Sequence, residues 1–111
     1  MVTTTGVKEA VNKARTFSFS VTTTDGTSTN VVTAAQVAAE GFATIRDIHL
    51  KCTGDKCFLG LGKAASTTHG RDIVPVWKDT YFNFANCAYD SIAVIRSGST
   101  NVTVEGYVVI G

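Results

Sequence analysis

Alternating apolar and polar residues form the clearest pattern along the chain, and they predict β-strands. Between Thr16 and Thr22, aromatic residues and valine alternate with serine and threonine. This period of two is typical of a strand that has one buried face and one face in water. Asp25-Gly26 then indicates a turn, because glycine accepts a positive φ without a steric cost. Val31 and Val32 begin the return strand.

Residues 45–62 predict a β-hairpin. A four-residue loop at 53–56 places three apolar pairs on one face of its two strands, namely Cys52 with Cys57, Leu50 with Leu59, and Ile48 with Leu61. A shift of one residue would place polar residues opposite apolar ones, so we expect this register to be fixed. Gly60 and Gly62 have no side chains, so we expect another segment to pack closely against the opposite face of their strand.

The end of the chain predicts a further hairpin, which joins residues 92–96 to residues 102–110. An odd-length loop sets Val94 opposite Val104 on one apolar face. The opposite face is also apolar in part, with Tyr107 and Val109 on the last strand. A terminal strand with two apolar faces is expected either at the centre of a two-layer core or under another protein chain.

One segment predicts a helix and another predicts an edge strand. Thr33 and Gln36 have the spacing of a capping box, alanines follow, and Gly41 suits the left-handed residue that ends a helix. Pro75 lies in a run of apolar residues and lacks an N–H, so residues 73–77 are expected at the edge of a sheet. Residues 63–71 are mostly small and polar and predict a surface loop.

These elements indicate an all-β protein, a β-sandwich or jelly-roll-like barrel with one short helix and an N-terminal arm. A chain of 111 residues fits a single domain, which we place at residues 16–111. Residues 1–15 are predicted to form the arm or a short helix, because valine and alanine recur there at helical spacing over a short length. The arm must therefore dock on a surface or stay mobile.

Charge and hydropathy narrow the classes of partner. The formal net charge is +1, so no strong field attracts nucleic acid or an acidic membrane. A small basic cluster at Lys8, Lys13 and Arg15 is partly offset by Glu9 and fits a solvated helix face better than a nucleic-acid site. No apolar run has the length of a signal sequence or a membrane span, so we expect synthesis in the cytoplasm and no membrane partner.

Three cysteines and two histidines are the candidate metal ligands. Cys52 and Cys57 face the predicted core, whereas His49 points to the other face of its strand, so these three cannot converge on one ion. Buried thiols that pack as small apolar groups fit the pattern best, and a Cys52–Cys57 disulfide is the main alternative. We therefore expect no metal and no cofactor, while the state of the thiol pair stays open.

The sequence contains no motif that indicates catalysis. His69 lies in a loop near Asp72, with threonine beside it, but serine and threonine are so frequent that any histidine has one nearby. The acidic residues lie mostly in predicted turns, where turn chemistry and solvation account for them. We expect a protein that is not an enzyme and that has no small-molecule ligand.

A carbohydrate-binding β-sandwich module is the alternative to a structural role. Trp77, Tyr81 and Tyr89 could form an aromatic platform on which sugar rings stack their apolar faces. For Trp77, however, the flanking Val74 and Val76 favour a place in the core.

Several segments in the second half of the chain follow one another in a distinctive order. Cys-Phe-Leu-Gly-Leu-Gly at 57–62 leads through a loop of small residues to Asp-Ile-Val-Pro at 72–75 and then to an aromatic strand. Asp-Ser-Ile-Ala-Val-Ile-Arg-Ser-Gly-Ser at 90–99 and a Val-Thr-Val strand follow. From about Ile48 onward, this order resembles small β-sandwich structural proteins of tailed-phage virions.

The resemblance implies a capsid decoration, head–tail or fibre-associated protein of a virion, assembled in symmetric copies. It implies that the partners are other copies of the chain and a capsid or other virion protein, and it provides no catalytic residues. The resemblance covers about half of the chain and depends on strand patterning. We predict that the contacts involve the arm, the edge segment around Trp77 and the last strand, through Val2, Val7, Val11, Arg15, Trp77, Tyr107 and Val109.

Overall fold

The computed structural model describes residues 14–111, which contain eight strands and one short helix. The helix, α2 (Ala34–Ala39), lies between the second and third strands. The strands are β1 (Arg15–Thr22), β2 (Thr29–Val32), β3 (Ile45–Thr53), β4 (Cys57–Leu61), β5 (Ile73–Val76), β6 (Tyr81–Phe84), β7 (Ile92–Arg96) and β8 (Thr103–Ile110).

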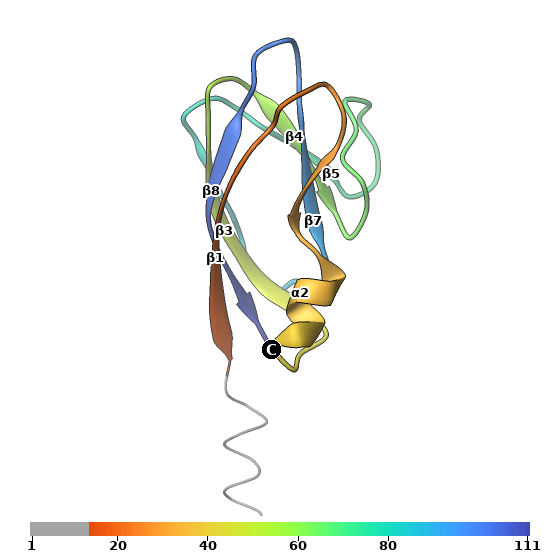
Figure 1. The fold of residues 1–111 in the computed structure, drawn as a ribbon, viewed down its shortest axis with the longest axis vertical. Helices are drawn as coiled ribbons and strands as arrows, with labels where there is room; N and C mark the ends of the chain where they lie inside the picture. The colour runs from red at the N-terminus through yellow and green to blue at the C-terminus, as the bar shows by residue number, and fades with distance from the viewer. Residues whose placement is uncertain (1–13) are drawn as a thin grey trace, which may run out of the picture.

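The strands form two antiparallel four-stranded sheets, with the orders β1-β8-β3-β6 and β2-β7-β4-β5. The sheets lie face to face as two layers (Figure 1). Eight strands in this order form a jelly roll, the two-sheet arrangement that is built from two Greek keys. The prediction of an all-β sandwich or jelly-roll-like barrel with one short helix is confirmed. β1 begins at Arg15, one residue before the predicted start of the domain.

Six of the seven connections between successive strands pass from one sheet to the other, and only β4 and β5 are consecutive strands of the same sheet. The hairpins predicted at 45–62 and 92–110 are therefore wrong, because β3 and β8 lie in one sheet while β4 and β7 lie in the other. The turn at Asp25-Gly26 likewise leads from β1 to the opposite sheet. These connections are arches over the edge of the core.

An arch and a hairpin place the same inward side chains opposite each other, which explains the error. Cys52 and Cys57 lie equally far from the loop, but they belong to different ladders. In the backbone register, Cys52 pairs with Val104 on β8, and Cys57 pairs with Val76 and Arg96. The apolar pattern determines which face of a strand points inward, but it does not identify the strand beside it.

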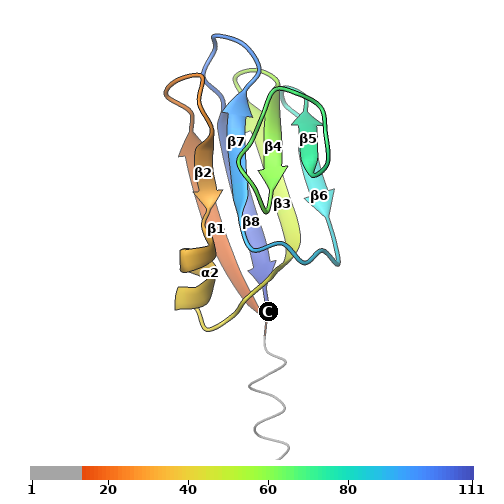
Figure 2. The ribbon, with the colours of Figure 1, turned by 90° about the vertical axis from the view of Figure 1, so that its right-hand side faces the viewer.

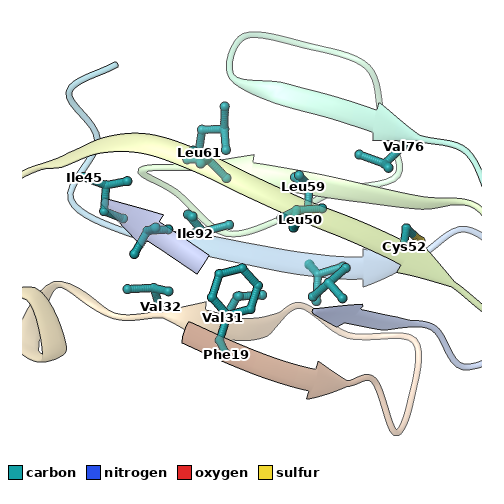
Figure 3. Packing of buried hydrophobic residues seen from close by; sticks show 14 of the residues in the cluster. Phe19, Val31, Val32, Ile45, Leu50, Cys52, Leu59, Leu61, Val76 and Ile92 are labelled. Carbon is teal, nitrogen blue, oxygen red and sulfur yellow. The ribbon is translucent and has the colours of Figure 1, made fainter. Parts of the chain in front are cut away.

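The inner faces of the two sheets form one apolar core. Leu50 and Cys52 on β3 belong to one buried cluster with Leu59 and Leu61 on β4, in the other sheet (Figure 3). Ile48 on β3 belongs to the same cluster. Each of these five residues has at most 2% of its surface exposed. Complete burial of a leucine or isoleucine side chain is worth about 1.5–3 kcal/mol, so this packing holds the two layers together.

The short helix follows its sequence signals. The Thr33 hydroxyl accepts a hydrogen bond from the Gln36 N–H (3.1 Å), and the Gln36 side chain accepts one from the Thr33 N–H (2.8 Å). Gly41, just beyond the end of the helix, has a φ of 86°, so the predicted capping box and left-handed stop are confirmed. With six residues, α2 is far too short to cross a membrane, and no other helix within residues 14–111 has the length and apolar character to do so.

The loop between β4 and β5 folds back over the outer face of the second sheet, where it passes across β4 (Figure 2). A Cβ atom on Gly60 would lie 2.5 Å from the Lys63 carbonyl oxygen and 2.6 Å from that of Ala64. The Ala65 N–H donates to the Ser28 hydroxyl at 2.9 Å, which ties the loop to the β1–β2 connection. For Gly60, the prediction that another segment packs closely against its strand is confirmed, and the loop covers a face that would otherwise expose Phe58.

We expect Gly60→Ala to destabilise the protein by about 1–3 kcal/mol, because the added methyl group collides with two backbone carbonyls and must push the loop off the sheet. Urea unfolding of the purified chain measures the change. Gly70→Ala in the same loop is the matched control, since nothing lies within 4 Å of a Cβ atom there, and it should change stability by less than about 0.5 kcal/mol. Equal effects of the two substitutions would contradict the packed loop.

Candidate interaction surfaces

The edge of the sandwich where β5 and β6 meet is the first candidate surface. Within residues 14–111, β5 pairs only with β4 and β6 only with β3, so each is an edge strand of its sheet. The predicted edge position of Pro75 is confirmed. The connecting turn is tied to β3, because the Cys52 carbonyl accepts from the Asp79 N–H (2.8 Å) and the Cys52 N–H donates to the Thr80 carbonyl (3.2 Å). The backbone of this edge is therefore well supported.

Two exposed aromatic side chains flank this turn. Trp77 is 57% exposed and Tyr81 is 71% exposed. The Lys56 ammonium group lies 4.7 Å from the centre of the Trp77 ring, and the Lys51 ammonium group lies 5.5 Å from that of Tyr81. Such cation–π contacts are worth about 0.5–1 kcal/mol at exposed sites, so the lysines orient the rings while most of the ring surface stays in water. We call Trp77, Tyr81, Lys51 and Lys56 the aromatic edge.

The expectation that Trp77 lies in the core is wrong. Val74 and Val76 both point toward the core from β5, and consecutive residues of an extended chain point to opposite sides. Trp77 follows Val76 directly, so the burial of its neighbours places its own side chain outside. Trp77 is thus an exposed residue at the sandwich edge, and its role in a contact stays a prediction.

The outer face of the β1-β8-β3-β6 sheet is the second candidate surface. Tyr107 lies at its centre on β8, between Ser18 on β1 and His49 on β3, and is 42% exposed. The His49 and Tyr107 rings stack at 4.8 Å with an angle of 29° between their planes. The His49 Nδ1 lies 2.8 Å from the Asn83 Oδ1 on β6. These contacts form a polar and aromatic row across the sheet.

The remaining predicted contact residues have different surroundings. Val109 is half-buried on this outer face, between Thr16 and Asp47 in the register. Arg15 is exposed at the start of β1, opposite Ile110. Val2, Val7 and Val11 lie outside the described residues. The structure therefore separates Trp77 from Tyr107 and Val109, which belong to two different surfaces.

The candidate metal ligands are dispersed. Cys52 and Cys57 are free thiols in the core, while His49 is on the outer face of its sheet with Asn83. His69 lies edge-on to Phe58, with 5.3 Å between the ring centres. Within residues 14–111, no group of three histidine, cysteine or acidic side chains has a metal-binding arrangement.

The structure does not place Tyr89 with the other two aromatic residues of the predicted sugar platform. Tyr89 is half-buried against the core and bridges to Ile45 at the start of β3, whereas Tyr81 pairs with Lys51 near the end of that strand. The Tyr89 hydroxyl donates to the Asp72 carboxylate at 3.0 Å. Burial, and then this hydrogen bond, raise the pKa of Tyr89 above its ordinary value of 10.0.

Sequence reasoning missed the partners of the aromatic residues. His49 and Lys51 lie on the outer face of β3, and their contacts with Tyr107 and Tyr81 come from strands that are distant in sequence. The sequence predicts Lys56 in a hairpin loop, but the β3–β4 connection is an arch that brings Lys56 to the β5–β6 edge, over the Trp77 ring. No local motif signals these contacts.

Comparison of the chain with protein-family models, with curated proteins and with solved structures finds no match.

We expect Tyr89→Phe to cost about 0.5–1.5 kcal/mol of stability near neutral pH, because Asp72 loses its hydrogen-bond donor. The pKa of Tyr89 is higher in the folded protein than in the unfolded chain, where it is near 10. The contribution of Tyr89 to the free energy of unfolding is therefore fully present below about pH 10 and is lost as the pH rises through the folded-state pKa. The difference in unfolding free energy between the wild type and the variant should therefore shrink above about pH 10. Urea unfolding at a series of pH values measures it.

Tyr107→Phe is the control for the loss of a tyrosine hydroxyl, since Tyr107 is exposed and lies on the outer face of the β1-β8-β3-β6 sheet. A wild-type minus Tyr89→Phe difference that stays constant to the highest pH would contradict this assignment.

Proposed function

We propose that the chain is a structural protein of a virus particle, a capsid decoration or head–tail-associated component that acts through contacts between protein subunits. The aromatic edge is the observation that carries the proposal. Tryptophan and tyrosine are enriched at the energetic centres of protein interfaces, and Trp77 and Tyr81 hold large ring surfaces in water on a supported backbone. A protein partner that covers these rings would bury their apolar surface, which favours binding.

The strand order supports the proposal at the level of the fold. Jelly rolls recur in viral capsid proteins, and they also occur in lectin domains and cupins. A fold does not determine a function, so the strand order makes a particle role reasonable without selecting it. The resemblance of the second half of the chain to tailed-phage structural proteins points in the same direction.

The two edge strands favour different contacts. Pro75 in β5 lacks an N–H, which weakens this edge as a template for an added strand. β6 contains no proline, and among the described residues no strand pairs with its outer edge. We infer that burial of the Trp77 and Tyr81 side chains supplies most of the binding free energy. A strand of the partner can also pair with the main chain of β6. Tyr107 and Val109 give the outer sheet face a second, smaller contact. A permanent interface of this kind buries on the order of 2,000 Å².

We expect the purified chain to form an oligomer of fixed size, because the proposed partners include other copies of the chain. Light scattering coupled to size-exclusion chromatography measures the mass. The double substitution Trp77→Ala with Tyr81→Ala should shift the protein to smaller species, since each truncated interface anchor typically costs about 2 kcal/mol or more of binding free energy. A strictly monomeric wild type at high concentration would count against the proposal.

The matched control for this experiment is Arg71→Ala, which changes an exposed residue of the β4–β5 loop away from the aromatic edge. Its oligomer should equal the wild type. Thermal unfolding of all variants confirms that each is folded before its mass is interpreted.

A carbohydrate-binding module is the second candidate, and the exposure of Trp77 and Tyr81 on one edge favours it. Sugar rings stack their apolar faces on such side chains. A lysine ammonium group already lies over each ring, so at most one face of each ring is free for a sugar.

Binding to a glycan array tests this alternative. If the chain is a carbohydrate-binding module, it should bind a defined set of glycans, lose the signal in Trp77→Ala and keep it in Tyr107→Ala. Under the structural proposal, the wild type gives no specific signal on the array.

A further inference from the structure

Two thiols meet inside the sandwich at the end that carries the aromatic edge. Cys52 is near the end of β3 and Cys57 begins β4, so they belong to opposite sheets. Both have none of their surface exposed, and both are free. Both side chains belong to the same buried cluster, which they enter from the two ends of the arch that joins their strands. Two buried cysteines at the ends of one short arch are candidates for a covalent link between the layers.

The arch between the two cysteines is short and well ordered. Four residues connect them, and Gly54 turns the chain with a φ of 100°. The Cys52 thiol donates to the Asp55 carbonyl at 3.0 Å. The backbone of Cys52 is also bound to the β5–β6 turn. These contacts fix the position of Cys52 at one end of the arch, and Cys57 lies at the other end.

The two thiols differ in acidity. The hydrogen bond from Cys57 stabilises the thiolate of Cys52 and lowers the pKa of Cys52, while the same hydrogen bond and burial raise the pKa of Cys57. The lowered pKa favours the thiolate of Cys52, which is the nucleophilic form of a thiol. Cys57 is positioned as the resolving thiol.

We propose that Cys52 and Cys57 are an oxidation site at which hydrogen peroxide produces a disulfide that links the two sheets. This inference goes beyond the proposed function and does not depend on it. The Cys52 thiolate attacks one oxygen of the peroxide, the O–O bond breaks, and Cys52 becomes a sulfenic acid. The departing hydroxide takes up the proton that the Cys52 thiol released, which forms the first water. The Cys57 sulfur then attacks the Cys52 sulfur, the S–O bond breaks, and the Cys57 proton leaves with the hydroxyl group as water. Two thiols are oxidised and one peroxide is reduced to two waters.

Access for the oxidant requires a local opening of the arch, because neither sulfur is exposed. The arch is a connection at the end of the sandwich and carries the exposed residue Gly54, and such connections open more readily than core strands. Peroxide is small enough to enter through a small opening. The disulfide should therefore form slowly and then lock the end of the sandwich at which the aromatic edge lies.

Peptide mapping of the reduced, full-length chain after peroxide treatment tests the proposal. Trypsin cleaves after Lys51, Lys56 and Lys63, so the two cysteines fall in the separate peptides 52–56 and 57–63. The expected result is a linked pair of these two peptides, cleaved by dithiothreitol, with Cys87 still available for alkylation. Cys52 and Cys57 that both alkylate fully after peroxide, or a disulfide to Cys87, would overturn the proposal.

Thermal unfolding gives a second measurement. The short loop closed by the disulfide should raise the melting temperature by about 10 °C, reversibly with dithiothreitol. Cys87→Ala is the matched control and should keep the whole shift, because Cys87 lies beside Arg46 at the opposite end of β3. Cys57→Ala should abolish it, and a shift that survives this substitution would contradict the assignment. If that variant does not fold, peptide mapping of the wild type decides alone.

Discussion

Burial of the inner sheet faces against each other is the interaction on which the rest of the molecule depends. Nearly every connection crosses between the layers, so a strand pairs with partners that are remote in sequence. β8, the last strand, lies between β1 and β3 and places Gly106 beside both Phe19 and Leu50. The β1-β8-β3-β6 sheet is therefore complete only when β8 has paired with β1 and β3. A hairpin of neighbouring strands cannot form this half of the core by itself.

This arrangement also determines which surfaces face outward. Val76 is buried in the core, and the side chain of the next residue, Trp77, is exposed to solvent at the edge of the sandwich. Lys56 reaches the same edge because the β3–β4 arch crosses between the layers, and it lies over the Trp77 ring. The β3–β4 arch therefore has two effects. It brings Lys56 to the exposed aromatic edge, and it places Cys52 and Cys57 in the core at its two ends.

Much of the fold could be predicted from the sequence, since alternation, capping and proline act locally. Thr33, Gly41 and Pro75 all occupy the expected roles. The strand partners could not be predicted, because Cys52 and Cys57 are opposed equally well in a hairpin and in an arch. The candidate surfaces were found only in part. The contacts that define them, such as that between His49 and Tyr107, join residues far apart in the chain.

We propose that this jelly roll is a component of a virus particle, in which other protein covers the exposed rings of Trp77 and Tyr81. The most direct measurement is the copy number of the chain in intact particles purified from cells that produce it, determined by quantitative mass spectrometry relative to the main shell protein. The account predicts many copies at a fixed ratio that survives repeated purification. Particles that are complete but lack the chain, or carry only traces of it, would contradict the account.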